Sequence, residues 1–276
     1  MREIIYNSSS PLADLRAFGQ TVGHDIRAVL RVGRQLFVRN LRVQYRQSVL
    51  GYLWLLAPPL FLALTWTLLS KANLLQGRQP TVPLPLFVLT GIFLWQGFVE
   101  MLNSPLQQLT AVRATLAKVR VPHEAFVVAA VGVVVFNLLV RLLVLGGVMW
   151  WYDVGWHVTL LWVPVGLAAL LGLGLGLGWV IALFGLLYSD VANALTLLIN
   201  MWFLITPVVY VVPSRYASVL SLNPVTPLLT TTRNWLLTGV AHPTPGFWPV
   251  VGLAGASVAL GWLAYRLAQP HLIARF

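Results

Sequence analysis

The chain has 276 residues, of which 58% are hydrophobic and only 9% are charged. A soluble domain usually carries about a quarter charged residues, so these few charges cannot cover the surface of a soluble globule of this length. The high hydrophobicity also excludes a disordered chain. A basic nucleic-acid-binding protein is disfavoured, because the 18 Lys and Arg residues lie between long apolar runs rather than on one folded face. The composition therefore predicts an all-α membrane protein.

Six segments are long and apolar enough to cross a bilayer, which needs about 20 apolar residues per helix. We expect no cleavable signal peptide, since residues 1–50 lack a short apolar stretch followed by a small-residue cleavage site. Residues 51–276 are therefore predicted to form one six-span transmembrane domain. The predicted spans 1 to 6 cover residues 52–69, 83–102, 126–150, 158–187, 191–212 and 247–268.

The cations are distributed unequally between the two sides of these spans. Eight Lys and Arg residues precede span 1, three lie between spans 2 and 3, and two, Arg266 and Arg275, lie at the C-terminal end, all on one side. Only four lie on the other side, and Arg141 falls inside span 3. Cytoplasmic loops are enriched in Lys and Arg. We therefore expect both termini in the cytoplasm.

Residues 25–50 are predicted to form an amphipathic helix at the cytoplasmic interface, after a polar tail over residues 1–24. On a helical wheel, six arginines share an arc of about 140° and five apolar residues share a separate arc of about 120°. Such a helix lies in the membrane interface with its cations near anionic headgroups. It is either a topological anchor alone or also a surface that meets an anionic lipid substrate. The arginines are Arg27, Arg31, Arg34, Arg39, Arg42 and Arg46, and the apolar residues are Ile26, Val29, Leu30, Leu36 and Phe37.

The segment between spans 5 and 6 contains two apolar stretches that are too short to cross a membrane. The second has helix punctuation, with Thr226 as N-cap, Pro227 at the first helical position and Gly239 just past the end. Its roughly 12 helical residues reach only about 18 Å. We therefore expect a re-entrant helical segment at the external mouth of a pathway, or a helix that lies flat on the outer leaflet.

No catalytic or metal-binding pattern occurs in the sequence. There is no Gly-Lys dipeptide and hence no P-loop, cysteine is absent, and the seven acidic residues and five histidines are widely scattered. The alternating glycines from Gly172 to Gly178 lack the GxGxxG spacing and lie inside span 4, where they predict a close helix–helix contact. We therefore expect no enzyme activity, no metal and no cofactor in this chain.

Arg141 is the charged residue that lies deepest in a predicted span, about 22 Å along span 3. Intramembrane charges usually face protein or a wet cavity. Three interpretations follow: Arg141 snorkels outward, pairs with an acid such as Asp153 or Glu100, or faces a conduit and attracts a phosphate.

Aromatic residues make up 12% of the chain, and several lie within spans rather than at their ends. Such rings usually pack or sit at headgroup level, but together they are also suited to lining a path for sugar rings. Pro58, Pro59 and Pro207 are expected to bend spans 1 and 5 around a cavity. With Arg141, the candidate translocation path comprises Trp54, Trp66, Phe93, Trp95, Trp202, Phe203 and Tyr210.

Six short motifs occur in the order typical of one transporter family. Their order and the six spans resemble the ABC-2 type transporter permeases that export polysaccharides, over about residues 25–270. Ser189 stands where that family usually has Arg, and Val121 and His123 replace its aromatic and basic residues around a proline. The motifs are RVQYRQSVLGYLWLLAPPL (42–60), LTGIFLW (89–95), KVRVPHE (118–124), YSD (188–190), TPVVY (206–210) and NPVTP (223–227) followed by Arg233.

The resemblance implies a homodimer carried by two copies of a separate ABC ATPase, which would bind the ATP and Mg. ATP-driven opening would export a lipid-linked polysaccharide of the undecaprenyl-pyrophosphate type, with O-antigen favoured over teichoic acid or capsule. The positions of this sequence that match the family's motifs imply three groups of site residues. Arg42, Tyr45, Arg46 and Tyr52 would meet the substrate headgroup; Arg113, Lys118, Arg120 and Glu124 would couple to the ATPase; Asn223, Pro224, Pro227 and Arg233 would form the external gate.

Two alternatives remain open at the level of sequence. An ABC-2 permease for a drug or a simple lipid would not accumulate lipid-linked glycan when it is deleted. A channel or membrane scaffold without energy coupling would bring no ATPase with it, and ATP would not change its transport. Neither alternative involves nucleic acid.

Overall fold

The computed structural model describes residues 29–43, 51–71, 80–116, 123–188, 190–212 and 214–273, and within these ranges it contains helices and turns but no β-strand. The predicted all-α fold is therefore confirmed for the described part of the chain. A helix over residues 29–43 precedes the labelled elements. These are α2 (Leu53–Lys71), α3 (Leu84–Leu116), α4 (His123–Trp151), the 3₁₀ helix η1 (Val158–Trp162), α5 (Val163–Gly185), α6 (Asp190–Ile205), the 3₁₀ helix η2 (Ser214–Tyr216), α7 (Ala217–Leu220), α8 (Val225–Leu237) and α9 (Phe247–Ile273).

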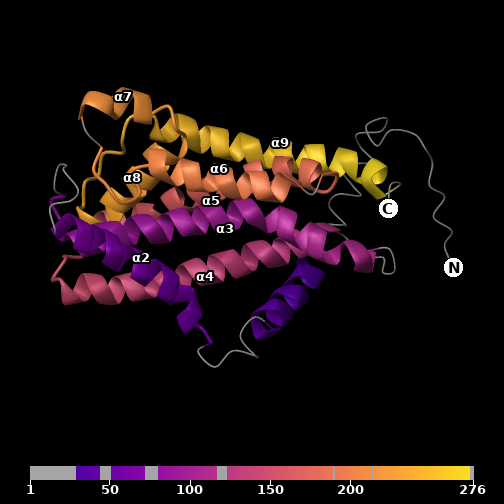
Figure 1. The fold of residues 1–276 in the computed structure, drawn as a ribbon, viewed down its shortest axis with the longest axis horizontal. Helices are drawn as coiled ribbons and strands as arrows, with labels where there is room; N and C mark the ends of the chain where they lie inside the picture. The colour runs from indigo at the N-terminus through magenta and orange to yellow at the C-terminus, as the bar shows by residue number, and fades with distance from the viewer. Residues whose placement is uncertain are drawn as a thin grey trace.

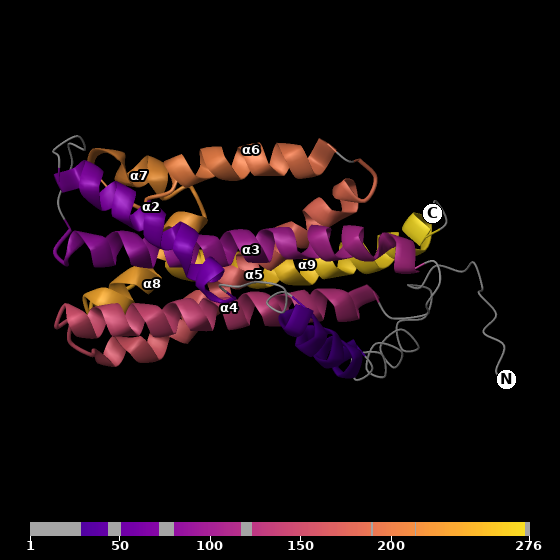
Figure 2. The same ribbon diagram turned by 60° about the horizontal axis from the view of Figure 1, so that its bottom comes forward.

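The long helices run side by side, and successive ones run in opposite directions (Figures 1 and 2). The short helices α7 and α8 and the connection from α4 to α5 lie at one end of the bundle, which we call the α8 end (Figure 1). The last turns of α9 and the first turns of α4 lie at the other end, which we call the opposite end (Figure 1). This layout brings segments that are far apart in sequence together at each end.

Among the residues that the structure describes, four stretches are long and apolar enough to cross a membrane, which supports an integral membrane protein. They are Leu84–Thr110, Glu124–Trp151, Val158–Gly185 and Phe247–Ala268. The apolar helices of predicted spans 1 and 5 are shorter, at Leu53–Leu69 and Asp190–Ile205, so the count of six spans stays a prediction.

Two predicted boundaries are wrong. Helix α3 continues to Leu116, beyond the predicted end of span 2 at residue 102. Helix α6 ends at Ile205 rather than near residue 212, because Pro207 has no N–H to continue the helix and the chain turns there. Pro58 and Pro59, by contrast, lie inside α2, which continues through them.

The glycine run of span 4 forms the predicted close contacts, on two faces of α5. An ideal Cβ at Gly174 would stand 2.9 Å from the carbonyl oxygen of Phe98 on α3, and one at Gly178 would meet the Leu102 carbonyl on the same helix. On the other face, a Cβ at Gly176 would overlap Ser257 of α9. The absence of side chains thus lets α5 approach both α3 and α9 at backbone distance.

We expect Gly178→Ala to destabilise the protein by about 1–3 kcal/mol, because the added methyl meets a backbone carbonyl that cannot move without separating α5 from α3. The matched control is Gly172→Ala on the same helix, whose methyl would lie 3.8 Å from Val258, an ordinary contact. Thermal unfolding in detergent measures the difference. Equal midpoints for the two variants would contradict the expectation.

The helix over residues 29–43 packs on the first turns of α4. An ideal Cβ at Gly33 would stand 2.9 Å from Val128, and one at Gly132 would stand 2.9 Å from the ring of Phe37. The described arginines of this helix are exposed, whereas Gly33 lies on the packed face; these arginines are Arg31, Arg34, Arg39 and Arg42. Leu30, which the wheel placed on the apolar face, is 54% exposed. The rest of the predicted range 25–50 lies outside the described residues.

Candidate functional site

Helix α8 is buried at one end of the bundle, packed against α3, α5, α9 and η1. Its start differs from the prediction: the N-cap residue is Pro224, and Thr226 lies inside the helix. The physical reason is that the side-chain oxygen of Asn223 accepts a hydrogen bond from the Val225 N–H at 3.1 Å, so the cap is supplied further upstream. Gly239 follows the helix with φ +67°, as the predicted C-terminal glycine requires.

Asn223 joins the end of α6 to the start of α8. Its side-chain oxygen accepts a hydrogen bond from the Trp202 indole at 2.9 Å, and its amide nitrogen donates to the Thr206 hydroxyl at 2.8 Å. With the bond from the Val225 N–H, one partly buried side chain therefore holds three groups. This connection makes the end of α6 and the start of α8 one unit.

Arg233 makes a second connection between the same elements. The guanidinium is buried, and its Nη1 donates to the carbonyl oxygens of Pro207 at 3.2 Å and Val208 at 3.0 Å. Its Cζ lies 3.8 Å from the centre of the Phe87 ring, which is a close cation–π contact. Carbonyls that are freed where a helix ends need such a donor when they are buried.

Gly91 on α3 allows this approach, because a Cβ there would overlap the Val208 carbonyl oxygen and stand 3.2 Å from Arg233 Nη1. Sequence reasoning named Asn223 and Arg233 but missed the roles of Gly91 and Phe87. The signal available was that Gly91 lies in the LTGIFLW motif. Three motifs that are far apart in sequence thus meet at one place, which we call the α6–α8 junction. Its residues are Gly91, Trp202, Thr206, Pro207, Val208, Asn223 and Arg233.

The two prolines of the predicted gate lie at the start of α8. Pro224 is the N-cap residue and Pro227 is in the first turn, where the missing N–H costs no helical hydrogen bond. The Pro227 carbonyl accepts a hydrogen bond from the Thr244 hydroxyl at 3.2 Å, and Thr244 also bonds Thr231 at 2.7 Å. The loop before α9 is therefore tied to α8 as well.

Several of the predicted path aromatics pack together between α3 and α6. The Trp95 ring lies 6.3 Å from Trp202 and 5.9 Å from Phe203, and Phe98 lies 5.3 Å from Trp202. Phe93 and Trp95 are buried, while Trp54 is exposed on α2 and Trp66 is half-buried. The Tyr210 hydroxyl donates to the Ile205 carbonyl at 3.0 Å, at the end of α6. The rings other than Trp54 thus lie in or against the protein core, and their role in a path stays a prediction.

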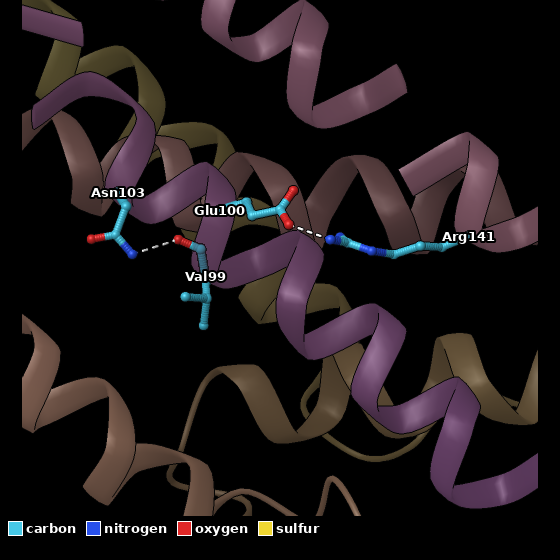
Figure 3. Close-up of polar contacts among 4 residues, drawn as sticks. All are labelled: Val99, Glu100, Asn103 and Arg141. Carbon is cyan, nitrogen blue, oxygen red and sulfur yellow. Dashed lines mark hydrogen bonds and ion pairs between the residues drawn. The ribbon is translucent and has the colours of Figure 1, made fainter. Parts of the chain in front are cut away.

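Arg141 pairs with Glu100 across α4 and α3, which is one of the interpretations drawn from the sequence. Figure 3 shows the two side chains pointing toward one another, with Nη2 of Arg141 donating to Oε1 of Glu100. The Arg141 side chain is 3% exposed and that of Glu100 is 31% exposed. Arg141 Nε and Nη1 and Glu100 Oε2 are buried without a hydrogen bond. The pair thus neutralises a charge that would be costly inside a membrane.

Of the predicted ATPase-coupling residues, Arg113 and Glu124 are described, and both lie toward the opposite end of the bundle. Arg113 lies within α3 rather than in a loop, and Lys118 and Arg120 lie outside the described residues. Glu124 is in the first turn of α4, where a negative charge suits the helix dipole. Its Oε1 stands 4.0 Å from Nε of Arg266 on α9.

The predicted headgroup residues are described only in part. Arg42 is exposed on the helix over residues 29–43, and Tyr52 lies in the turn before α2 with its ring 5.9 Å from Phe136. Tyr45 and Arg46 lie outside the described residues. Within the described ranges, no group of three His, Cys, Asp or Glu residues is placed to hold a metal ion.

Comparison with known proteins identifies the family. No family model matches the chain. The chain is 30% identical to the O-antigen export system permease protein RfbA of Myxococcus xanthus, over 86% of this chain and 90% of that protein. It is 24% identical to a protein of the same name from Klebsiella pneumoniae, over 74% of this chain and 79% of that protein. The chain belongs to the ABC-2 type permeases of polysaccharide export systems.

Proposed function

We propose that this chain is the transmembrane permease subunit of an ATP-driven ABC exporter that moves a lipid-linked polysaccharide, O-antigen first among the candidates, from the cytoplasm across the bacterial inner membrane. The observation that carries the proposal is the 30% identity over nearly the whole length of a protein named as an O-antigen export permease. The apolar helices fit a membrane subunit.

In this proposal two copies of the chain form the permease, and two copies of a separate ABC ATPase bind ATP and Mg. The opposite end of the bundle faces the cytoplasm. There the exposed arginines of the helix over residues 29–43, Arg42 among them, attract the pyrophosphate headgroup of the substrate. Arg113, Lys118, Arg120 and Glu124 form the ATPase contact, and Tyr45, Arg46 and Tyr52 complete the headgroup site.

The α8 end then faces the periplasm, and the α6–α8 junction is the external gate. The hydrogen bonds of Asn223 and Arg233 support this role, because they couple any movement of the end of α6 to α8. Pro224 and Pro227 fix where α8 begins. The aromatics between α3 and α6, together with Trp54, Trp66 and Arg141, would line the path once the two copies move apart.

Deletion of the gene tests the proposal. We expect surface O-antigen to disappear and lipid-linked glycan to accumulate on the cytoplasmic side, and the gene on a plasmid should restore export. The plasmid gene should fail when the partner ATPase carries a substitution that abolishes ATP hydrolysis. Unchanged surface glycan after deletion would refute the polysaccharide assignment, and export that persists with the inactive ATPase would refute energy coupling.

A further inference from the structure

The connection between α4 and α5 exposes an unusual amount of apolar surface. Trp150 and Trp151 at the end of α4 are 74% and 79% exposed, and Trp156 in the connection is 70% exposed. Val158 and Leu161 of η1 are 82% and 78% exposed. No Lys or Arg occurs between residues 142 and 214, so this surface carries no cation. We call these five residues the η1 patch.

The other side of η1 is attached to α8. The hydroxyl of Thr159, which is buried, donates to the carbonyl oxygen of Trp235 at 2.9 Å. The Trp162 ring lies 6.2 Å from the Trp235 ring, and Trp235 is 1% exposed. At the end of α8, a Cβ on Gly239 would overlap the ring of His157, so the two segments are in direct contact there too. One short element thus presents Val158 and Leu161 outward and holds α8 inward.

The chemistry of the η1 patch fits the boundary between lipid headgroups and acyl chains. Trp is enriched at that boundary because its ring is apolar and its N–H is polar. The patch is continuous with two apolar stretches that are long enough to cross, Glu124–Trp151 and Val158–Gly185. Figure 2 places the connection from α4 to α5 on the side of the bundle away from α6, and hence away from the α3–α6 aromatics of the proposed path. Lipid is therefore the occupant that the patch meets.

We propose that the η1 patch anchors the chain in the headgroup layer of the leaflet at the α8 end, and that η1 thereby holds α8 at a fixed depth. The anchor is independent of what the permease transports. The patch partitions into the boundary region, and the Thr159 bond and the Trp162–Trp235 packing transmit that position to α8.

Site-directed spin labelling tests the anchor. The chain has no cysteine, so Leu161→Cys and Val158→Cys each give one labelled position in the full chain. In phosphatidylcholine vesicles without glycan, we expect both labels to be reached by oxygen in preference to a water-soluble nickel chelate. His242→Cys, exposed in the loop between α8 and α9, is the control and should show the reverse. Water-like accessibility at residues 158 and 161, or protection that appears only after glycan is added, would overturn the proposal.

Hydrogen exchange tests the support of α8. We expect Leu161→Ser to speed amide exchange in residues 225–237 about tenfold, because it removes one anchoring apolar side chain. The matched control Val219→Ser also removes an exposed apolar side chain at this end, but on α7, and should leave α8 exchange unchanged. Thr159→Val should speed α8 exchange while the spin label at residue 161 keeps its depth. Equal effects of Leu161→Ser and Val219→Ser, or no effect of Thr159→Val, would overturn the role of η1 as the support.

Discussion

Replacing Glu100 with Gln is expected to damage the protein more than replacing Glu100 and Arg141 together. Glu100→Gln leaves the buried Arg141 guanidinium without its counter-charge. Breaking a buried ion pair on one side costs about 3–5 kcal/mol, whereas removing both charges is often nearly neutral. The single variant should therefore give less folded protein and a lower unfolding midpoint, and the Glu100→Gln/Arg141→Gln double variant should recover most of the loss.

The single and the double variant together also decide what Arg141 does in transport. If the Arg141–Glu100 ion pair is only structural, the double variant also recovers glycan export. If Arg141 attracts a phosphate in the path, the double variant folds but does not export. Glu124→Gln provides a control for stability. Its partner Arg266 stands 4.0 Å away, whereas Arg141 donates a direct hydrogen bond to Glu100. A Glu124→Gln midpoint as low as that of Glu100→Gln would contradict the importance of this direct contact.

Replacing Arg233 with Leu is expected to separate the end of α6 from α8. The carbonyls of Pro207 and Val208 would lose a charged donor, and the contact with the Phe87 ring would be lost. A hydrogen bond to a charged group and a desolvated cation–π contact are worth about 2 kcal/mol each. The two carbonyls share one donor atom, Nη1, so we count one bond and one ring contact and expect a loss of about 4 kcal/mol in stability. If the α6–α8 junction is the gate, export should fall as well.

Arg215→Leu is the matched control, since Arg215 lies in the same segment between α6 and α9 but is exposed. It should change neither stability nor export. Arg233→Lys should retain part of the stability, because the charge remains while the planar set of donors is lost. Similar unfolding midpoints for Arg233→Leu and Arg215→Leu would show that Arg233 does not hold the junction together.

The elements that the sequence predicted well are those with a local physical signal. A long apolar run marks a span, and glycines four apart mark a close helix contact, as Gly174 and Gly178 show against α3. Gly239 was predictable because only a residue tolerant of positive φ suits that position. The end of α3 was not predicted. Polar residues after position 102 end the apolar stretch that marks a membrane span, but the helix itself continues through them to Leu116.

The contacts that build the candidate site have no such local signal. Asn223 reaches back to Trp202, and Arg233 approaches Gly91 from more than 100 positions away. The N-cap of α8 was misassigned for the same reason: Thr226 suits a cap by residue type, but the Asn223 side chain was already placed to bond the Val225 N–H. The motifs indicated which residues matter, and only the fold shows that they meet.

The sparse packing of α6 has a mechanical consequence. Its neighbours are mainly α5 and α3, and Leu197, Leu198 and Met201 are about two-thirds exposed. Its last turn, in contrast, is fastened by Asn223. Its first residue, Asp190, follows the end of α5 at Gly185 after only four residues, so α6 is attached at both ends and loosely packed between them. At 1.5 Å per residue, its 16 residues span about 24 Å, so a movement at the junction would be carried along α6 to the end of α5 on the other side of the bundle.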